Sequence, residues 1–141
     1  MKILLPVDGS ACSLRAADHL ISHCSWFRDV PEIHLLHVHA PIPIGRVLAH
    51  VGHETLQTYY REESQEILTA PQAKLDAAGL FHTTHIHVGQ AAEIIAKMST
   101  ELHVDLIIMG SHGRSGVLGL VMGSVANQAL HLAQCPVLLV K

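Results

Sequence analysis

The residues whose chemistry is easiest to read are the glycines in the last third of the chain. Six residues there could form one site: Gly110, Gly113, Gly116, Gly119, Gly123 and Ser124. Glycine tolerates positive φ and lets backbone N–H groups approach a ligand that a Cβ would exclude. At a helix start, unpaired N–H groups and the macrodipole favour an anion, and the Ser124 hydroxyl adds a donor. The segment predicts a phosphate cradle. The alternative is a glycine-rich loop in which Ser124 serves only as an N-cap.

The connection that carries these glycines is unusually long for its place. It runs from residue 110 to residue 122, whereas strand-to-helix connections usually have about 2–6 residues. It does not follow the commonest phosphate-binding patterns. A P-loop needs Gly-Lys, which the chain lacks, and a dinucleotide fingerprint needs more glycines than Asp8-Gly9-Ser10 offers after the first strand.

Five apolar segments predict strands, and they alternate with helical patterns. The strands are expected at residues 2–7, 32–39, 82–88, 104–109 and 136–141, and the helices at 10–27, 53–78, 91–102 and 124–133. Strict alternation indicates a parallel sheet with right-handed crossovers and helices on both faces. The expected fold is a three-layer α/β/α sandwich forming a single domain, residues 1–141. Pro71, inside the second helical pattern, predicts a kink or a break.

Composition excludes several functions. The 141 residues carry 9 Lys and Arg against 12 Asp and Glu, a formal charge of -3, so no basic field favours nucleic acid. The uncharged stretch 115–140 is interrupted by glycines and polar residues, and no membrane span is expected. The first residues have too short an apolar run for a signal peptide. Three cysteines without a CxxC pair fit a reducing compartment, so we expect a cytoplasmic protein.

Histidine is over-represented. There are 13, and His37 and His39, like His85 and His87, are spaced so that both members of each pair face one side of a strand. No HExxH motif or Cys/His cluster accompanies them, so the pattern does not favour a metal site. We expect the histidines at strand ends and on exposed helix faces. A second hypothesis is a response to pH, because histidine titrates near pH ~6.5.

Four separated segments carry a family resemblance. Gly110, Gly113, Gly123 and Ser124 form the spacing G-x2-G-x9-G-[ST], which resembles the nucleotide-binding motif of the universal stress protein family. The segments LPVDGS, LLHVHAP and CPVLLVK are similar to the same family, in the same order. The resemblance therefore covers the chain from end to end.

The resemblance implies a five-stranded sheet of order 3-2-1-4-5, with ATP at the carboxyl ends of the first and fourth strands. Independently, these strands flank the switch point where open α/β sheets place ligands. Pro6, Asp8 and Val38 would surround adenine, with Asp8 and the Val38 backbone hydrogen-bonded to the base. For Asp8 the alternative is a turn or a cap of the first helix.

The rest of the ligand site also follows from the resemblance. Met109 and Gly110 would line the ribose, and a divalent cation, Mg²⁺ or Mn²⁺, would lie on the phosphate oxygens. The phosphate contacts would come from Gly113, Gly123, Ser124 and Val125. Arg114 follows Gly113, where it either reaches the phosphates or points into solvent. His112 either donates to phosphate or is an exposed loop residue.

The last strand, at the expected sheet edge, suggests a partner. An exposed apolar edge invites pairing, and the resemblance implies a homodimer through antiparallel pairing of strands 136–141. A monomer with a covered edge is the alternative.

The resemblance favours an ATP-binding stress-response regulator. No nucleophile and base accompany the glycines, so no catalytic residue is predicted. Enzymatic activity stays open as slow ATP hydrolysis or phosphoryl transfer using Arg114 and His112. A third possibility is a dimeric interaction module that binds no nucleotide.

Overall fold

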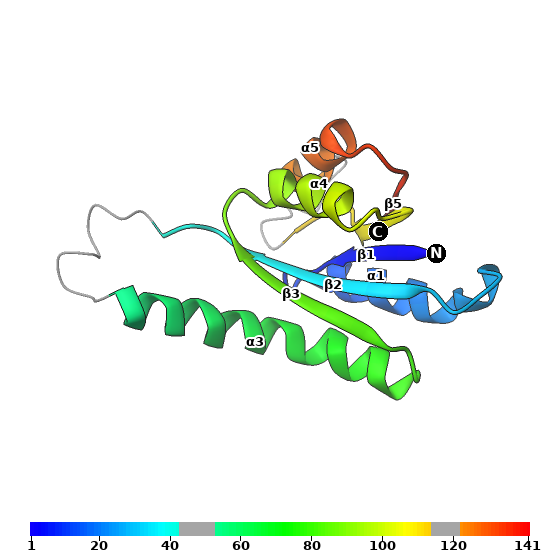
Figure 1. The fold of residues 1–141 in the computed structure, drawn as a ribbon, viewed down its shortest axis with the longest axis horizontal. Helices are drawn as coiled ribbons and strands as arrows, with labels where there is room; N and C mark the ends of the chain where they lie inside the picture. The colour runs from blue at the N-terminus through cyan, green and yellow to red at the C-terminus, as the bar shows by residue number, and fades with distance from the viewer. Residues whose placement is uncertain (43–52, 114–121) are drawn as a thin grey trace.

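The computed structural model describes residues 1–42, 53–113 and 122–141 (Figure 1). Its elements, in chain order, are β1 (Lys2–Pro6), α1 (Ala11–Ser22), the 3₁₀ turn η1 (Cys24–Trp26), β2 (Glu32–His39), α3 (His53–Ala77), β3 (His82–Val88), α4 (Ala91–Glu101), β4 (Leu106–Gly110), α5 (Ser124–Leu132) and β5 (Val137–Val140).

The strands form one parallel sheet of order β3-β2-β1-β4-β5, as predicted. Ile3 in β1 lies opposite Ile33 in β2 on one side and Leu106 in β4 on the other. The chain places β2 and β3 on one side of β1, and β4 and β5 on the other. The carboxyl ends of β1 and β4 therefore flank the switch point, where such sheets leave room for a ligand.

Two apolar cores hold helices against the two faces of the sheet. On one face, Leu5 and Leu35 pack with Leu20 of α1 and Leu68 of α3. On the other, Leu4, Leu36 and Ile107 pack with residues of α4 and α5. Figure 1 shows α1 and α3 on one side of the sheet and α4 and α5 on the other. The predicted three-layer α/β/α arrangement is confirmed.

The first helix ends earlier than its sequence pattern predicts. α1 stops at Ser22, and a separate 3₁₀ turn follows at Cys24–Trp26, so a single helix to residue 27 is wrong. His23 has φ -113° and ψ 17° and closes the helix, with its backbone N–H bonded to the His19 carbonyl. The ends of the other elements shift by only a residue or two.

The sequence predicts a kink or a break at Pro71, and helix α3 continues through this residue without a break. A proline in a helix interior removes one hydrogen bond and crowds the preceding turn. Pro71 is among the fully buried side chains. Its apolar ring is removed from water, which offsets part of that cost.

Two histidines lie where the sequence pattern did not place them. His34 and His37, on β2, are 5% and 4% exposed, so the expectation of strand-end or exposed histidines is wrong for both. His37 Nδ1 donates to the Val7 carbonyl at 2.8 Å, which satisfies a polar atom of a buried ring. The same-face prediction holds for His37 and His39, whose ring centroids are 6.4 Å apart.

None of the helices in the described ranges combines the length and the apolar character that crossing a bilayer requires.

Candidate functional site

A tight turn at the carboxyl end of β1 forms the first wall of the site. Asp8 Oδ1 accepts a hydrogen bond from the Ser10 N–H at 3.0 Å, and Gly9 between them has φ +79°. That left-handed conformation suits glycine, because other residues meet a steric penalty there. Ser10 then caps α1, its Oγ accepting from the Ser13 N–H at 3.2 Å. Asp8 thus holds the turn, while Ser10, not Asp8, is the helix cap.

The two ends of the glycine-rich connection meet at Ser111. The Ser111 N–H donates to the Val140 carbonyl at 2.8 Å, and the Ser111 carbonyl accepts from the Gly123 N–H at 2.9 Å. The Ser10 hydroxyl reaches the His112 carbonyl at 3.4 Å. The base of the connection is therefore tied to β5, to the start of α5 and to the turn after β1. Arg114, in the segment 114–121, lies outside the described residues.

A Cβ at any of the three motif glycines would crowd a neighbouring atom, most severely at Gly110. A Cβ on Gly110 would lie 2.8 Å from the backbone carbon of Cys12 and 2.9 Å from the Ser13 nitrogen. A Cβ on Gly113 would lie 2.7 Å from Asp8 Oδ2, and one on Gly123 would lie 3.2 Å from the Ser111 carbonyl oxygen. These glycines let the loop backbone approach the turn after β1 and the start of α5.

The amino end of α5 differs from those of the other helices along this edge. Its N-cap is Gly123, which makes no side-chain cap, and its first turn has no acidic residue. α1 is capped by Ser10, and the first turn of α4 carries Glu93. The positive end of the α5 dipole therefore has no side-chain cap and no first-turn carboxylate beside it. Ser124 and Val125, at this start, are both exposed.

The residues expected around adenine and ribose lie on the strands beside this edge. Pro6 ends β1 opposite Leu36, and Val38 lies further along β2, half-buried. Met109 is only 5% exposed and packs in the core beneath α4 and α5. The structure thus brings the predicted residues to one edge of the sheet.

Two serines that the sequence pattern did not single out connect the parts of this site. Ser10 bonds both the first turn of α1 and the loop, and Ser111 is 5% exposed at the junction of the loop's two ends. The Ser111 hydroxyl also lies 3.0 Å from His112 Nδ1. Each serine directly follows a glycine, Gly9 or Gly110, and that position is the only signal that the sequence offers for it.

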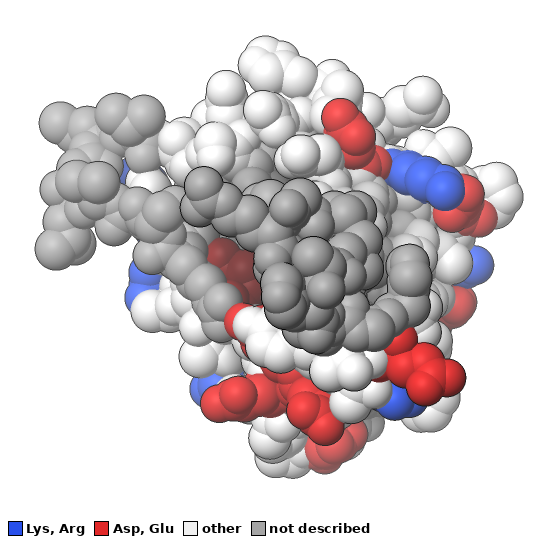
Figure 2. Space-filling view, turned by 90° about the vertical axis from the view of Figure 1, so that its left-hand side faces the viewer, with Lys and Arg blue, Asp and Glu red and all other residues white. Residues whose placement is uncertain are grey.

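The charges around this edge show how an anion can be held. Figure 2 views the molecule from this side, and acidic and basic side chains are interspersed on it, with acidic ones gathered toward the level of α3. α3 carries Glu54, Glu62, Glu63 and Glu66. No basic patch stands out among the coloured residues of this view. Among the described residues, main-chain donors and the α5 dipole are the groups suited to hold an anion at this edge.

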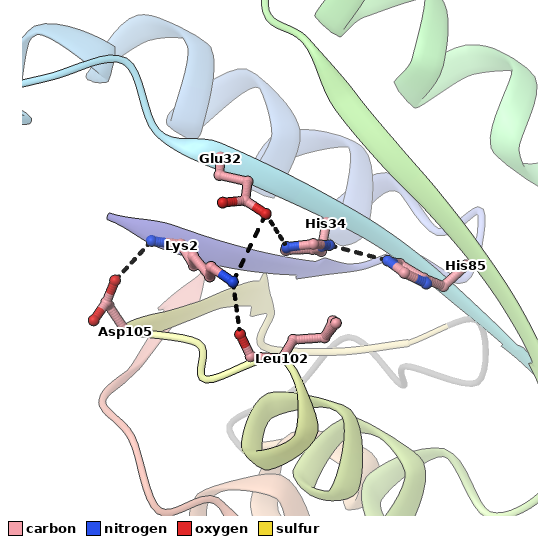
Figure 3. Close-up of polar contacts among 6 residues, drawn as sticks. All are labelled: Lys2, Glu32, His34, His85, Leu102 and Asp105. Atoms are coloured by element: carbon pink, nitrogen blue, oxygen red, sulfur yellow. Dashed lines mark hydrogen bonds and ion pairs between the residues drawn. The ribbon is translucent and has the colours of Figure 1, made fainter.

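A second polar cluster lies toward the amino end of the sheet (Figure 3). His34 Nε2 lies 3.1 Å from Glu32 Oε1, and His34 Nδ1 lies 3.0 Å from His85 Nε2. Since a carboxylate can only accept, His34 Nε2 donates to Glu32, and neutral His34 then accepts from His85. Lys2 Nζ lies 3.9 Å from Glu32 Oε1, and the Lys2 backbone N–H donates to Asp105 Oδ2 at 2.7 Å.

Burial lowers the pKa of His85 below its ordinary value of 6.5, and the neighbouring His34 and His87 lower it further. His85 therefore resists protonation. Within residues 1–42, 53–113 and 122–141, no group of three or more His, Cys, Asp or Glu side chains is arranged to hold a metal ion.

The fold and the site together define a class. A parallel sheet of order 3-2-1-4-5, in which a glycine-rich connection joins β4 to α5 beside the switch point, defines a doubly wound α/β protein. The model of the universal stress protein family matches residues 1–141. The chain belongs to the universal stress protein family.

Individual relatives support the same family assignment. Universal stress protein MJ0531 of Methanocaldococcus jannaschii is 33% identical over 140 residues, covering 99% of this chain and 81% of that protein. The solved structure of MJ0577, from the same organism, has a TM-score of 0.85 and 31% identity, covering 99% and 94% of the two chains. The Archaeoglobus fulgidus universal stress protein in complex with dAMP has a TM-score of 0.69 and 20% identity, covering 100% and 98%. At that identity, the third likeness shows the shared fold.

Proposed function

We propose that this protein binds ATP at the carboxyl ends of β1 and β4, with the triphosphate on the glycine-rich connection and the start of α5. One observation carries the proposal. The backbone comes so close to its neighbours at Gly110, Gly113 and Gly123 that a Cβ would crowd them. These glycines lie near the start of α5, which has neither a side-chain cap nor an acidic residue in its first turn. That combination suits phosphate oxygens, which accept hydrogen bonds from main-chain N–H groups.

The proposed phosphate contacts come from Gly113, Gly123, Ser124 and Val125, with Arg114 as a further cation. The Ser124 hydroxyl is exposed at the first position of α5, where it adds a donor to the N–H groups of the turn. A divalent cation, Mg²⁺ or Mn²⁺, would sit on the phosphate oxygens and neutralise part of their charge.

Asp8 faces the other part of the nucleotide. A carboxylate only accepts hydrogen bonds, so Asp8 is suited to a donor such as the adenine amino group. Its Oδ1 is held by the Ser10 N–H, which fixes the direction of the carboxylate. The Val38 backbone and Pro6 would complete the base pocket, and Met109 and Gly110 the ribose side. The dAMP complex of the Archaeoglobus fulgidus relative shows that a related fold takes an adenine nucleotide.

The proposed role is that of a cytoplasmic, homodimeric regulator of a stress response. β5 lies at the edge of the sheet, and its residues Val137–Val140 are all only partly buried. A second copy could pair with this edge across a two-fold axis. A sedimentation mass near that of a single chain at micromolar concentration would contradict the dimer.

Calorimetric titration with ATP and Mg²⁺ tests the binding proposal. The native protein should give a saturable isotherm, and Gly123→Val should abolish it, because branched carbons would crowd the loop base beside Ser111 and His112. Gln128→Val, at an exposed position of α5, is the matched control and should bind like the native protein. Circular dichroism of each variant establishes that it folds.

Absence of binding at millimolar ATP would contradict the proposal that the protein binds ATP. So would a folded Gly123→Val variant that binds ATP as tightly as the native protein.

A further inference from the structure

Two histidines and the single tryptophan gather at the carboxyl end of α1, at the opposite end of that helix from the proposed nucleotide site. The His19 and His23 rings stack with centroids 4.0 Å apart and planes inclined by 28°. Trp26, which is 69% exposed, meets the His23 ring edge-on at 4.2 Å and the His19 ring at 5.8 Å. Both histidines are partly exposed.

The helix geometry places the two imidazoles on one face. The His23 backbone N–H donates to the His19 carbonyl at 3.0 Å, so the helical i to i+4 spacing is kept although α1 ends at Ser22. Side chains four residues apart on a helix lie one above the other. This is the spacing with which two histidines of one helix bind a single metal ion, provided that the His19 ring turns out of the stack so that the lone pairs of both rings point to the same ion.

The tautomer of His23 is fixed in the form that a metal needs. His23 Nδ1 lies 2.8 Å from the His19 carbonyl oxygen, which can only accept, so Nδ1 carries the proton. Neutral His23 therefore presents the lone pair of Nε2. Metal-binding histidines commonly donate their other ring N–H to a carbonyl in this way, which orients the ring. Among the described residues, neither the His23 Nε2 nor either His19 ring nitrogen has a hydrogen-bond partner.

We propose that His19 and His23 form a two-imidazole surface site for a divalent first-row transition-metal ion, with Cu²⁺ bound most tightly and Zn²⁺ more weakly. Imidazole suits both ions, and affinity rises along the series to Cu²⁺. Since no third ligand side chain is grouped with the pair in the described part of the chain, water completes the coordination. Trp26 shields one side of the pair.

The single tryptophan gives the site its own reporter. Cu²⁺ held by His23 would lie close to the Trp26 ring and quench its fluorescence. Titrating the metal-free protein with Cu²⁺ should give saturable quenching at one equivalent, and excess Zn²⁺ should reverse it. His19→Gln and His23→Gln should each weaken Cu²⁺ binding by at least about tenfold.

His103→Asn is the matched control. His103 is an exposed histidine with φ +53°, a conformation that asparagine tolerates, and its loss should leave the quenching curve unchanged. Electron paramagnetic resonance of the one-equivalent Cu²⁺ complex gives a second readout that needs no tryptophan. It should show nitrogen coupling in the native protein that is reduced in each single variant.

Unchanged quenching and unchanged nitrogen coupling in the folded His19→Gln, His23→Gln double variant would overturn the proposal. Absence of saturable quenching in the native protein would do the same. Neither outcome bears on ATP binding, which rests on the other end of α1 and on a separate titration.

Discussion

The two ends of the sheet position polar groups in opposite ways. At the carboxyl end, the site is built from main chain: Gly110, Gly113 and Gly123 give room, and backbone N–H and carbonyl groups make the ties. Toward the amino end, side chains make the polar contacts, and His34 lies between Glu32 and His85. A main-chain site is sensitive to side-chain volume, whereas a side-chain network is sensitive to truncation and protonation. Different changes should therefore destabilise the two ends of the sheet.

The largest effect is expected at Gly110. Gly110→Val places carbon atoms against the backbone of Cys12 and Ser13, which cannot move aside as a flexible side chain would. We expect the free energy of unfolding to fall by about 3 kcal/mol, measured by urea denaturation. Gly79→Ala is the comparison: Gly79 has open space but φ +68°, so only backbone strain of about 1 kcal/mol is expected. Equal losses in the two variants would show that crowding at Gly110 is unimportant.

A truncation toward the amino end should cost somewhat less. His34→Ala removes a buried ring and leaves His85 without its hydrogen-bond partner, so the free energy of unfolding should fall by about 2 kcal/mol. A double-mutant cycle with His85→Ala isolates the pair, and the coupling should be about 1 kcal/mol. Strictly additive losses would mean that the two rings do not stabilise one another.

Acid should weaken the same cluster. The pKa of His85 is lowered in the folded protein, so the unfolded chain binds more protons in the range between that lowered value and 6.5. The stability that neutral His85 contributes is present above pH 6.5 and is lost as the pH falls below it. Urea denaturation in neutral and mildly acidic buffers should show a shallower loss for His85→Gln than for the native protein. The same loss in both would exclude His85 as a source of acid sensitivity.

The smallest effect is expected from the ion pair of Lys2 with Glu32. The two charged atoms are 3.9 Å apart and the side chains are 39% and 53% exposed, so solvent screens them. Glu32→Gln should remove the charge, keep an acceptor for His34, and lower the free energy of unfolding by less than about 1 kcal/mol. A larger loss, in the same denaturation assay, would indicate that Glu32 holds His34 through its charge.

The contrast between the two ends of the sheet also explains which features could be predicted from the sequence. Alternation of strands and helices predicted the parallel three-layer fold, and the family resemblance predicted the strand order. The spacing of Gly110, Gly113 and Gly123 predicted a phosphate cradle, and the structure shows that a Cβ at each of these positions would crowd a neighbouring atom. The ties through Ser10 and Ser111 were missed, since a serine beside a glycine has many uses.

The amino-end cluster could not be predicted in this way. His34 and His85 are far apart in sequence, and their contact depends on the register of β2 against β3, which pairs His34 with Thr83. Local pattern grouped His85 with His87 instead. The early end of α1 was also missed, because residues 10–27 keep a helical pattern past His23, where the backbone leaves the helix.

Backbone NMR of the isotope-labelled protein, titrated with ATP and Mg²⁺, tests the main-chain site most directly. If amides of the glycine-rich connection hold the phosphates, the largest shifts should fall on Gly113, Gly123, Ser124 and Val125. Adenosine, which lacks phosphate, should leave those four amides nearly unchanged. ATP that shifts other parts of the chain while these four amides stay in place would contradict the account.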